Sequence, residues 1–132
     1  LVSALDFITS QTFFDTRFVG VNGSSTGGTV AIRAAAEEDR IAAMVLRVPR
    51  NIDIIGLVPM IKAPTMVLQG SEDSIVLPEA REIYEALTCS KELHIVQGAG
   101  HLFDEKPEYF EEMTNATCAW FEKWFRKLAE ED

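Results

Sequence analysis

Residues that bind metals or form disulfides are scarce in this sequence, which has only 2 cysteines and 2 histidines among 132 residues. Cys89 and Cys118 lie too far apart for a disulfide framework or a zinc site, and neither has a histidine or a second cysteine nearby. No apolar run approaches the length of a membrane span, and the first residues do not resemble a signal peptide. We therefore expect structural thiols, no metal, no cofactor and a cytoplasmic location.

Basic residues are also in the minority, with 12 Lys and Arg against 21 Asp and Glu, which gives a formal net charge of −9. Nucleic acids and anionic membrane surfaces would repel such a chain, so we expect neither as a partner. Hydrophobic residues make up 47% and charged residues 25%, which is typical of a folded globular protein. The length fits a single domain over 1–132.

The most informative stretch places a serine between two glycines. Gly23-Ser24-Ser25-Thr26-Gly27 fits the Gly-x-Ser-x-Gly pattern of a nucleophile elbow, with Ser25 at its apex. An apolar run from Phe18 precedes it and small residues follow it, as expected for a strand, a sharp turn and a closely packed helix. The glycines suit such a turn because a Cβ at either position would collide with the strand or the helix.

Two other interpretations of this stretch are open. A tight strand-to-helix turn could use Ser25 only as a helix cap. Alternatively, the hydroxyl-rich segment from Ser24 to Thr29 resembles the phosphate loop of flavodoxins, which would make the chain an FMN-binding module. The loops that follow the later strands bear on this choice.

Hydrophobic periodicity predicts alternating helices and strands along the chain. This alternation implies parallel strands joined by right-handed crossovers, with helices on both faces. We therefore expect an α/β fold, a three-layer arrangement with about four strands. The expected elements are a helix over 1–11, a strand starting at Phe18, a helix over 26–38, a strand over 41–48, a short helix or irregular segment over 51–64, a strand over 65–69, a helix over 78–87, a strand over 91–96 and a long helix from Pro107.

Polar residues capable of catalysis follow two of the later strands. Asp73 ends the loop Gly70-Ser71-Glu72-Asp73 after the third strand, and His101 follows Gly98-Ala99-Gly100 after the fourth. In open parallel sheets such loops gather at the carboxyl edge, where the turn around Ser25 also lies. The chain order Ser25, Asp73, His101 is the order found in α/β-hydrolase triads.

These three side chains have complementary roles in acyl transfer. His101 would remove the proton of the Ser25 hydroxyl and later deliver it to the leaving group. Asp73 would fix the imidazole tautomer and stabilise the imidazolium. The main-chain N–H of Thr26 would donate a hydrogen bond to the oxyanion.

Other acids and a second histidine are also candidates. Glu72 is adjacent to Asp73, and Asp104 lies near His101, so either could replace Asp73 as the acid. His94 falls in the middle of a predicted strand with no acid placed for it. We therefore interpret His94 as structural or surface-exposed.

Three blocks of sequence carry a family resemblance, at 19–28, 61–73 and 98–103. They look like the corresponding blocks of the α/β-hydrolase superfamily and are most similar to its dienelactone hydrolase-like and esterase branch. The resemblance places Ser25, Asp73 and His101 in the nucleophile, acid and base positions. It implies a serine hydrolase that acts through an acyl-enzyme on a small-molecule substrate. Dienelactone hydrolases carry cysteine at the elbow, so Ser25 favours a carboxylic ester, thioester or amide.

The resemblance covers only the second half of that fold, from the helix before the nucleophile strand to the terminal helix. The family's earlier strands are absent, including the loop that supplies the second oxyanion N–H. Without them the strand at Phe18 would be an open hydrophobic edge, which soluble proteins avoid. We expect an N-terminal half, in the same polypeptide or in a partner chain, to cover it. A non-catalytic hydrolase-like fragment is therefore a further alternative.

The sequence also makes predictions about the substrate. The stretch 48–65 is too short for a large lid domain, so we expect a shallow pocket lined in part by Met60. Arg47 and Arg50 lie near the same rim in an acidic chain and could attract a negatively charged acyl group. The alternative is that both arginines pair with surface acids.

Overall fold

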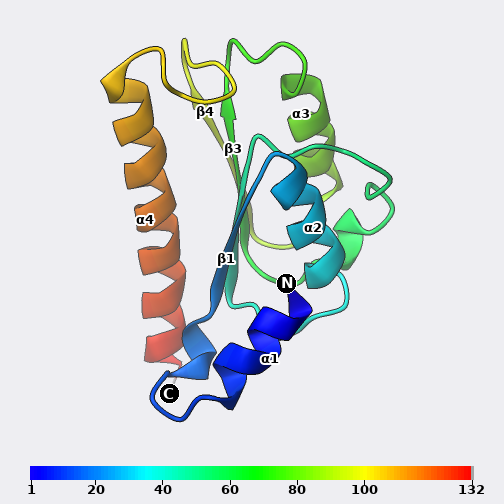
Figure 1. The fold of residues 1–132 in the computed structure, drawn as a ribbon, viewed down its shortest axis with the longest axis vertical. Coiled ribbons are helices and arrows are strands. Elements are labelled where there is room, and N and C mark those ends of the chain that lie inside the picture. Colours follow the sequence, from blue (N-terminus) through cyan, green and yellow to red (C-terminus); the bar gives the residue numbers. More distant parts are fainter. Residues whose placement is uncertain (132) are drawn as a thin grey trace.

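The computed structural model describes residues 1–131 as a parallel four-stranded sheet between two layers of helices (Figure 1). Its elements are α1 (Val2–Ser10), the 3-10 helix η1 (Thr16–Phe18), β1 (Gly20–Ser24), α2 (Thr26–Ala35), β2 (Ala43–Arg47), the 3-10 helix η2 (Val58–Met60), β3 (Thr65–Gly70), α3 (Leu77–Ala86), β4 (Lys91–Val96) and α4 (Pro107–Glu130). The strands lie in the order β1-β2-β3-β4, and all three pairs are parallel. The predicted α/β fold with four parallel strands is confirmed. None of the helices described here is long and apolar enough to span a membrane.

The two central strands are the most buried part of the chain. Neighbouring strands flank β2 and β3 on both sides, and helices cover both faces, so almost every residue in them is buried. This environment explains why their sequences are nearly continuous apolar runs. The strands β1 and β4 form the edges of the sheet. Within residues 1–131, no strand pairs with the outer edge of β1.

The core consists of two apolar clusters, one on each face of the sheet. Side chains alternate along β2, so that Met44 and Leu46 join the cluster under α1, α2 and α3, whereas Val45 joins the cluster under α4. Met113 and Trp120 anchor α4 on that second face. Figure 1 shows α4 on one side of the sheet and α2 and α3 on the other. This packing holds the carboxyl ends of all four strands at one edge.

The strand predicted to start at Phe18 starts at Gly20 instead. The residues before it form η1, because the Asp15 carboxylate accepts a hydrogen bond from the main-chain N–H of Arg17 at 3.2 Å. Local side-chain bonds of this kind stabilise a turn in competition with a strand.

One further element differs from its predicted bounds. Helix α2 ends at Ala35 rather than at 38, where three consecutive acids would oppose the helix dipole. The segment 51–64 contains only the short helix η2 and is otherwise irregular, as expected. Strand β4 has the predicted bounds, and α4 begins at Pro107 as expected.

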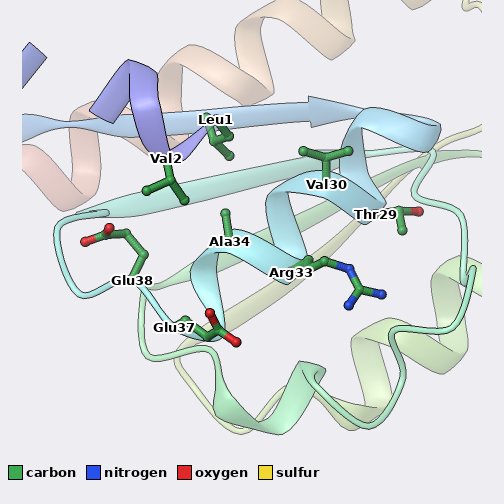
Figure 2. A pocket seen from close by; sticks show the side chains of 8 residues that line it. All are labelled: Leu1, Val2, Thr29, Val30, Arg33, Ala34, Glu37 and Glu38. Atoms are coloured by element: carbon green, nitrogen blue, oxygen red, sulfur yellow. The ribbon is translucent and has the colours of Figure 1, made fainter. Parts of the chain in front are cut away.

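Large apolar side chains are exposed on and just after α1, which precedes β1 in the chain. The side chains of Phe7 and Phe13 are 66% and 76% exposed on and just after α1. A hollow of about 380 Å³ lies between the start of α1 and the outer face of α2. Figure 2 shows Leu1, Val2 and Val30 around it, with charged side chains at the far end. Soluble domains rarely leave such a surface uncovered.

Candidate active site

Ser25 occupies a strained turn between β1 and α2. Its backbone angles are φ 54° and ψ −121°, a combination that residues other than glycine rarely adopt. Strain of this kind costs on the order of 1–3 kcal/mol and persists only where neighbouring groups enforce it. Ser25 is the N-cap residue of α2, but its hydroxyl makes no capping hydrogen bond. Ser25 is therefore at the N-cap position as that alternative expects, but its hydroxyl does not act as a cap and is available at the carboxyl end of β1.

We refer to residues 23–27 as the Ser25 turn. Its two glycines differ in whether a side chain would fit in their place. A Cβ added to Gly23 would lie 2.7 Å from the main-chain oxygen of Gly27 and 2.9 Å from Cβ of Ala31. A Cβ on Gly27 would meet no atom within 4 Å. The expectation that both glycines avoid a collision is thus correct for Gly23 and wrong for Gly27. Directly after the turn, Gly28 is the glycine that lacks room, because a Cβ there would lie 3.0 Å from Cβ of Pro49.

Main-chain hydrogen bonds connect Ser25 to the segment that follows β2. Its N–H donates to the main-chain oxygen of Arg47 at 2.9 Å, and its own oxygen accepts from Gly28 at 2.9 Å and from Arg50 at 3.3 Å. The hydroxyl of Thr29 donates to the Arg50 oxygen at 2.7 Å. The Ser25 turn and residues 47–50 therefore form one hydrogen-bonded unit.

Asp73 and His101 are brought together after β3 and β4. Oδ2 of Asp73 lies 2.5 Å from Nδ1 of His101, and the Asp73 side chain is buried. Because an ionised carboxylate only accepts hydrogen bonds, this contact assigns the proton of the neutral imidazole to Nδ1. Nε2 is then free to accept a proton. The second carboxylate oxygen, Oδ1, accepts from the N–H of Val76 at 3.3 Å and so fixes the carboxylate at the start of α3.

The loops that carry these two residues are hydrogen-bonded to each other. The N–H of Gly98 donates to Oγ of Ser71 at 2.7 Å, and the N–H of Glu72 donates to the main-chain oxygen of Ala99 at 2.9 Å. Gly70 lets the second loop pass closely over the end of β3, since a Cβ there would collide with the Ala99 oxygen. The loop after β4 thus crosses β3 at this glycine, and the two loops form a second unit.

Backbone strain gathers at the same edge of the sheet. Among residues 1–131, four residues other than glycine have positive φ, and three of them, Ser25, Val48 and Phe103, lie in the segments that follow β1, β2 and β4. Val48 and Phe103 have φ values of 45° and 59°, and both side chains are buried. Strained residues of this kind cluster at functional sites. The pattern supports a site at the carboxyl ends of the strands.

Glu79, in the first turn of α3, connects the two units. Its Oε2 accepts from Nε of Arg50 at 2.9 Å and from the N–H of Asn51 at 2.7 Å. The Arg50 guanidinium lowers the pKa of Glu79, although burial opposes this effect. The pKa of Arg50 is raised by the same hydrogen bond. A charged pair therefore joins the segment bonded to Ser25 with the helix that follows Asp73.

The structure separates the candidate acids and bases. Among residues 1–131, Asp73 is the only acid hydrogen-bonded to His101. The prediction that no acid is placed for His94 is wrong, because its Nε2 lies 2.9 Å from Oε1 of Glu112 on α4. The Ser25 hydroxyl makes no hydrogen bond with the described residues. No group of three or more His, Cys, Asp or Glu side chains in this part of the chain is arranged to hold a metal ion.

The predicted substrate contacts lie in different surroundings. Arg50 forms an ion pair with Glu79. For this arginine the structure thus agrees with the alternative that it pairs with an acid. Arg47 points towards α4, and Met60 is exposed in η2. Substrate binding by Arg47, Arg50 and Met60 stays a prediction. Sequence reasoning missed the part played by Glu79, because its partner lies 29 residues away and only packing brings the two together.

Comparison with known proteins identifies the family of this chain. A family profile described as PETase, PET hydrolase-like, matches residues 3–129. The chain belongs to this PET hydrolase-like family. The match extends from α1 to α4 and so includes Ser25, Asp73 and His101.

Solved structures similar to this PET hydrolase-like chain have the α/β-hydrolase fold. A dienelactone hydrolase from Anabaena variabilis superimposes with a TM-score of 0.87 and 34% identity, over 93% of this chain and 57% of that one. An acetyl xylan esterase from Paenibacillus sp. R4 gives a TM-score of 0.75 at 20% identity, over 93% of this chain and 50% of the esterase. At that identity the second similarity concerns the fold alone. The chain therefore has a dienelactone hydrolase- and esterase-like fold and spans little more than half of these proteins.

Two curated relatives carry a different name. They are proteins from two strains of Mycobacterium tuberculosis called putative phosphoribosyl transferases, 34% identical over 105 residues. The matched region is 78% of this chain but 23% of each relative.

The sheet of the PET hydrolase-like chain also bears on the flavodoxin-like alternative. Its strands are consecutive in space as in sequence. Flavodoxin-like sheets have the order 2-1-3-4-5 and bind FMN where that order reverses. No such reversal occurs among the four strands described.

Proposed function

We propose that this chain provides the Ser25-His101-Asp73 triad of a serine hydrolase that cleaves a carboxylic ester, thioester or amide. The observation that carries the proposal is the 2.5 Å contact between Asp73 and His101, made by a buried carboxylate. A carboxylate held against one imidazole nitrogen is useful where the other nitrogen has to accept a proton. The strained Ser25 turn at the same sheet edge supports the nucleophile.

The proposed reaction proceeds through an acyl-enzyme. Nε2 of His101 accepts the Ser25 hydroxyl proton while Oγ attacks the acyl carbon. The oxyanion that forms accepts a hydrogen bond from the N–H of Thr26, at the positive end of the α2 dipole. Collapse breaks the bond to the leaving group, which takes the proton from His101. Water, deprotonated by His101, then attacks the acyl carbon. The bond between that carbon and Oγ of Ser25 breaks, His101 returns the proton to Oγ, and the acid is released.

The free hydroxyl of Ser25 fits an enzyme without substrate. In such enzymes the bond between nucleophile and base is often long or absent and forms only in the complex. We propose that rotation of the Ser25 side chain brings its Oγ to Nε2 of His101 when an acyl group occupies the site. The Asp73 contact keeps the imidazole oriented in the meantime.

We propose further that additional strands of the same fold pair with the open edge of β1. The exposed Phe7 and Phe13 and the partial coverage of the similar dienelactone hydrolase, 57%, support this. These strands would also bring a second oxyanion donor, whose absence costs about 10²- to 10³-fold in rate. Binding of an apolar dye to the 132-residue chain should fall when any natural sequence that precedes Leu1 is included. Unchanged dye binding would contradict this part of the proposal.

The name of the mycobacterial relatives does not provide a second candidate function. This chain covers 23% of each of those proteins, so the transfer of a phosphoribosyl group cannot be assigned to the matched part. No contact of the Ser25 turn favours that reaction over acyl transfer.

The acyl-enzyme is the intermediate to test. The chain, with and without preceding natural sequence, is mixed with excess 4-nitrophenyl butyrate, and nitrophenol release and intact mass are followed. We expect a stoichiometric burst and an acyl adduct on Ser25, both lost in Ser25→Ala and kept in the exposed control Ser3→Ala. A burst of equal size from Ser25→Ala, or no adduct in any form, would contradict the proposed function.

A further inference from the structure

The residue beside the proposed nucleophile is held by an arginine side chain. Nε of Arg47 donates to Oγ of Ser24 at 3.0 Å. The main-chain oxygen of the same arginine accepts from the N–H of Ser25 at 2.9 Å. Ser24 and Arg47 are paired in the β1–β2 register, which places both side chains on the same face of the sheet. Arg47 therefore binds two successive residues of the Ser25 turn through different atoms.

The Arg47 side chain is itself fixed from α4. Its Nη1 donates to Sδ of the buried Met113 at 3.1 Å. Within residues 1–131 the half-buried guanidinium forms no ion pair, and its side-chain partners, a hydroxyl and a thioether, are neutral. Partial burial of a guanidinium costs hydration, and here no carboxylate partner offsets that cost, so ion pairing does not explain the position of this side chain. Its contact with Ser24 accounts for its position.

We propose that Arg47 is a positioning residue, which keeps the Ser25 turn in its strained conformation by holding the Ser24 hydroxyl. The proposal rests on Ser25 acting as the nucleophile. Any residue at position 47 could supply the main-chain oxygen, but the donor to the Ser24 hydroxyl belongs to the Arg47 side chain. If Ser24 were released, the adjacent Ser25 could relax and its hydroxyl would move. Displacement of a reacting group by about 1 Å can lower a rate by about 10²-fold.

Steady-state kinetics separate positioning from substrate binding. Arg47→Met keeps the length of the side chain but removes its donors, and Ser24→Ala removes the acceptor. We expect each to lower kcat for 4-nitrophenyl butyrate about 10- to 100-fold with KM little changed, and the double variant to lose no more than either one. Arg47→Lys, which keeps one donor, should recover part of kcat. Arg81→Met, on the exposed surface of α3, is the matched control and should match the parent chain.

The kinetic results that would overturn the proposal are an unchanged kcat in Arg47→Met, a loss confined to KM, or losses that multiply in the double variant. Amide hydrogen exchange provides a readout that does not depend on activity. Exchange of the Ser25 N–H should be faster in Arg47→Met and Ser24→Ala than in Arg81→Met, and equal exchange in all three overturns the proposal. If no acyl-enzyme forms, with or without any preceding sequence, the proposed function fails. The hydrogen-exchange result still decides whether Arg47 positions the Ser25 turn.

Discussion

The carboxylate of Asp73 contacts both His101 and the residue that directly precedes α3. Oδ2 lies 2.5 Å from Nδ1 of the imidazole, and Oδ1 accepts the N–H of Val76 at 3.3 Å. The orientation of the imidazole is therefore tied to Val76, the residue immediately before the helix that follows β3. A substitution that keeps one oxygen can separate the two roles.

Asp73→Asn should abolish most of the activity without unfolding the chain. The amide keeps an oxygen for Val76, but it no longer provides the anion that selects the imidazole tautomer and stabilises the imidazolium. We expect kcat to fall about 10⁴-fold, with only a small change in the thermal midpoint. Glu72→Gln removes the neighbouring exposed charge and should keep most of the activity. A comparable loss in both variants would argue against Asp73 as the specific partner of His101.

Gly70→Ala should disturb both the stability and the site. The added methyl group would collide with the main-chain oxygens of Ala99 and Gly100, which cannot move without displacing the loop that carries His101. We expect a loss of about 1–3 kcal/mol in the free energy of unfolding and a lower kcat, measured by denaturant unfolding and ester hydrolysis. Gly56→Ala, where a Cβ meets nothing within 4 Å, is the matched control. Equal stability of the two variants would contradict the proposed crossing of the loop over β3.

The two glycines of the Ser25 turn should respond differently to alanine. Gly27→Ala adds a methyl group in open space in the first turn of α2, and we expect it to stabilise the chain by about 0.5–1 kcal/mol. Gly23→Ala should destabilise it, because the new Cβ would lie 2.7 Å from a main-chain oxygen. Thermal unfolding of both variants measures the difference. A larger loss for Gly27→Ala than for Gly23→Ala would show that the turn is packed differently.

Glu79→Gln should lower stability in a pH-dependent way. Its pKa is lowered in the folded state by Arg50, so the charged pair stabilises the fold fully above the ordinary glutamate value of about 4.5. That stabilisation is lost as the pH falls through the lowered pKa. Thermal midpoints of parent and variant should therefore differ most at neutral pH and converge in acid. A difference that stays constant from pH 7 to about pH 2 would exclude this origin.

Much of the fold could be predicted because its signals are local. The apolar runs of β2 and β3 and the helical spacing in α4 each lie within one segment, and the alternation of elements implies the parallel sheet. The loops that carry Asp73 and His101 were identified for the same reason. Glu72 stayed open as the acid because adjacent residues look alike in sequence, and the burial of Asp73 at the start of α3 distinguishes them.

The features that the sequence did not reveal depend on contacts between distant segments. The contacts of Arg47 with Ser24 and with Met113 depend on its place in the β1–β2 register and on the position of α4. The contact between His94 and Glu112 likewise requires α4 to cross β4. Periodicity within one segment cannot report which side of a sheet a later helix covers.

Labelling with a fluorophosphonate tests the central claim most directly, because the reagent forms a bond only with an activated serine hydroxyl. The parent chain, a longer form that includes any natural sequence preceding Leu1, and Ser25→Ala of each are treated and then digested for mass spectrometry. We predict one adduct, on Ser25, strongest in the longer form and absent from both Ser25→Ala variants. Labelling of the variants at the parent level, or an unmodified Ser25 in every form, would contradict the account.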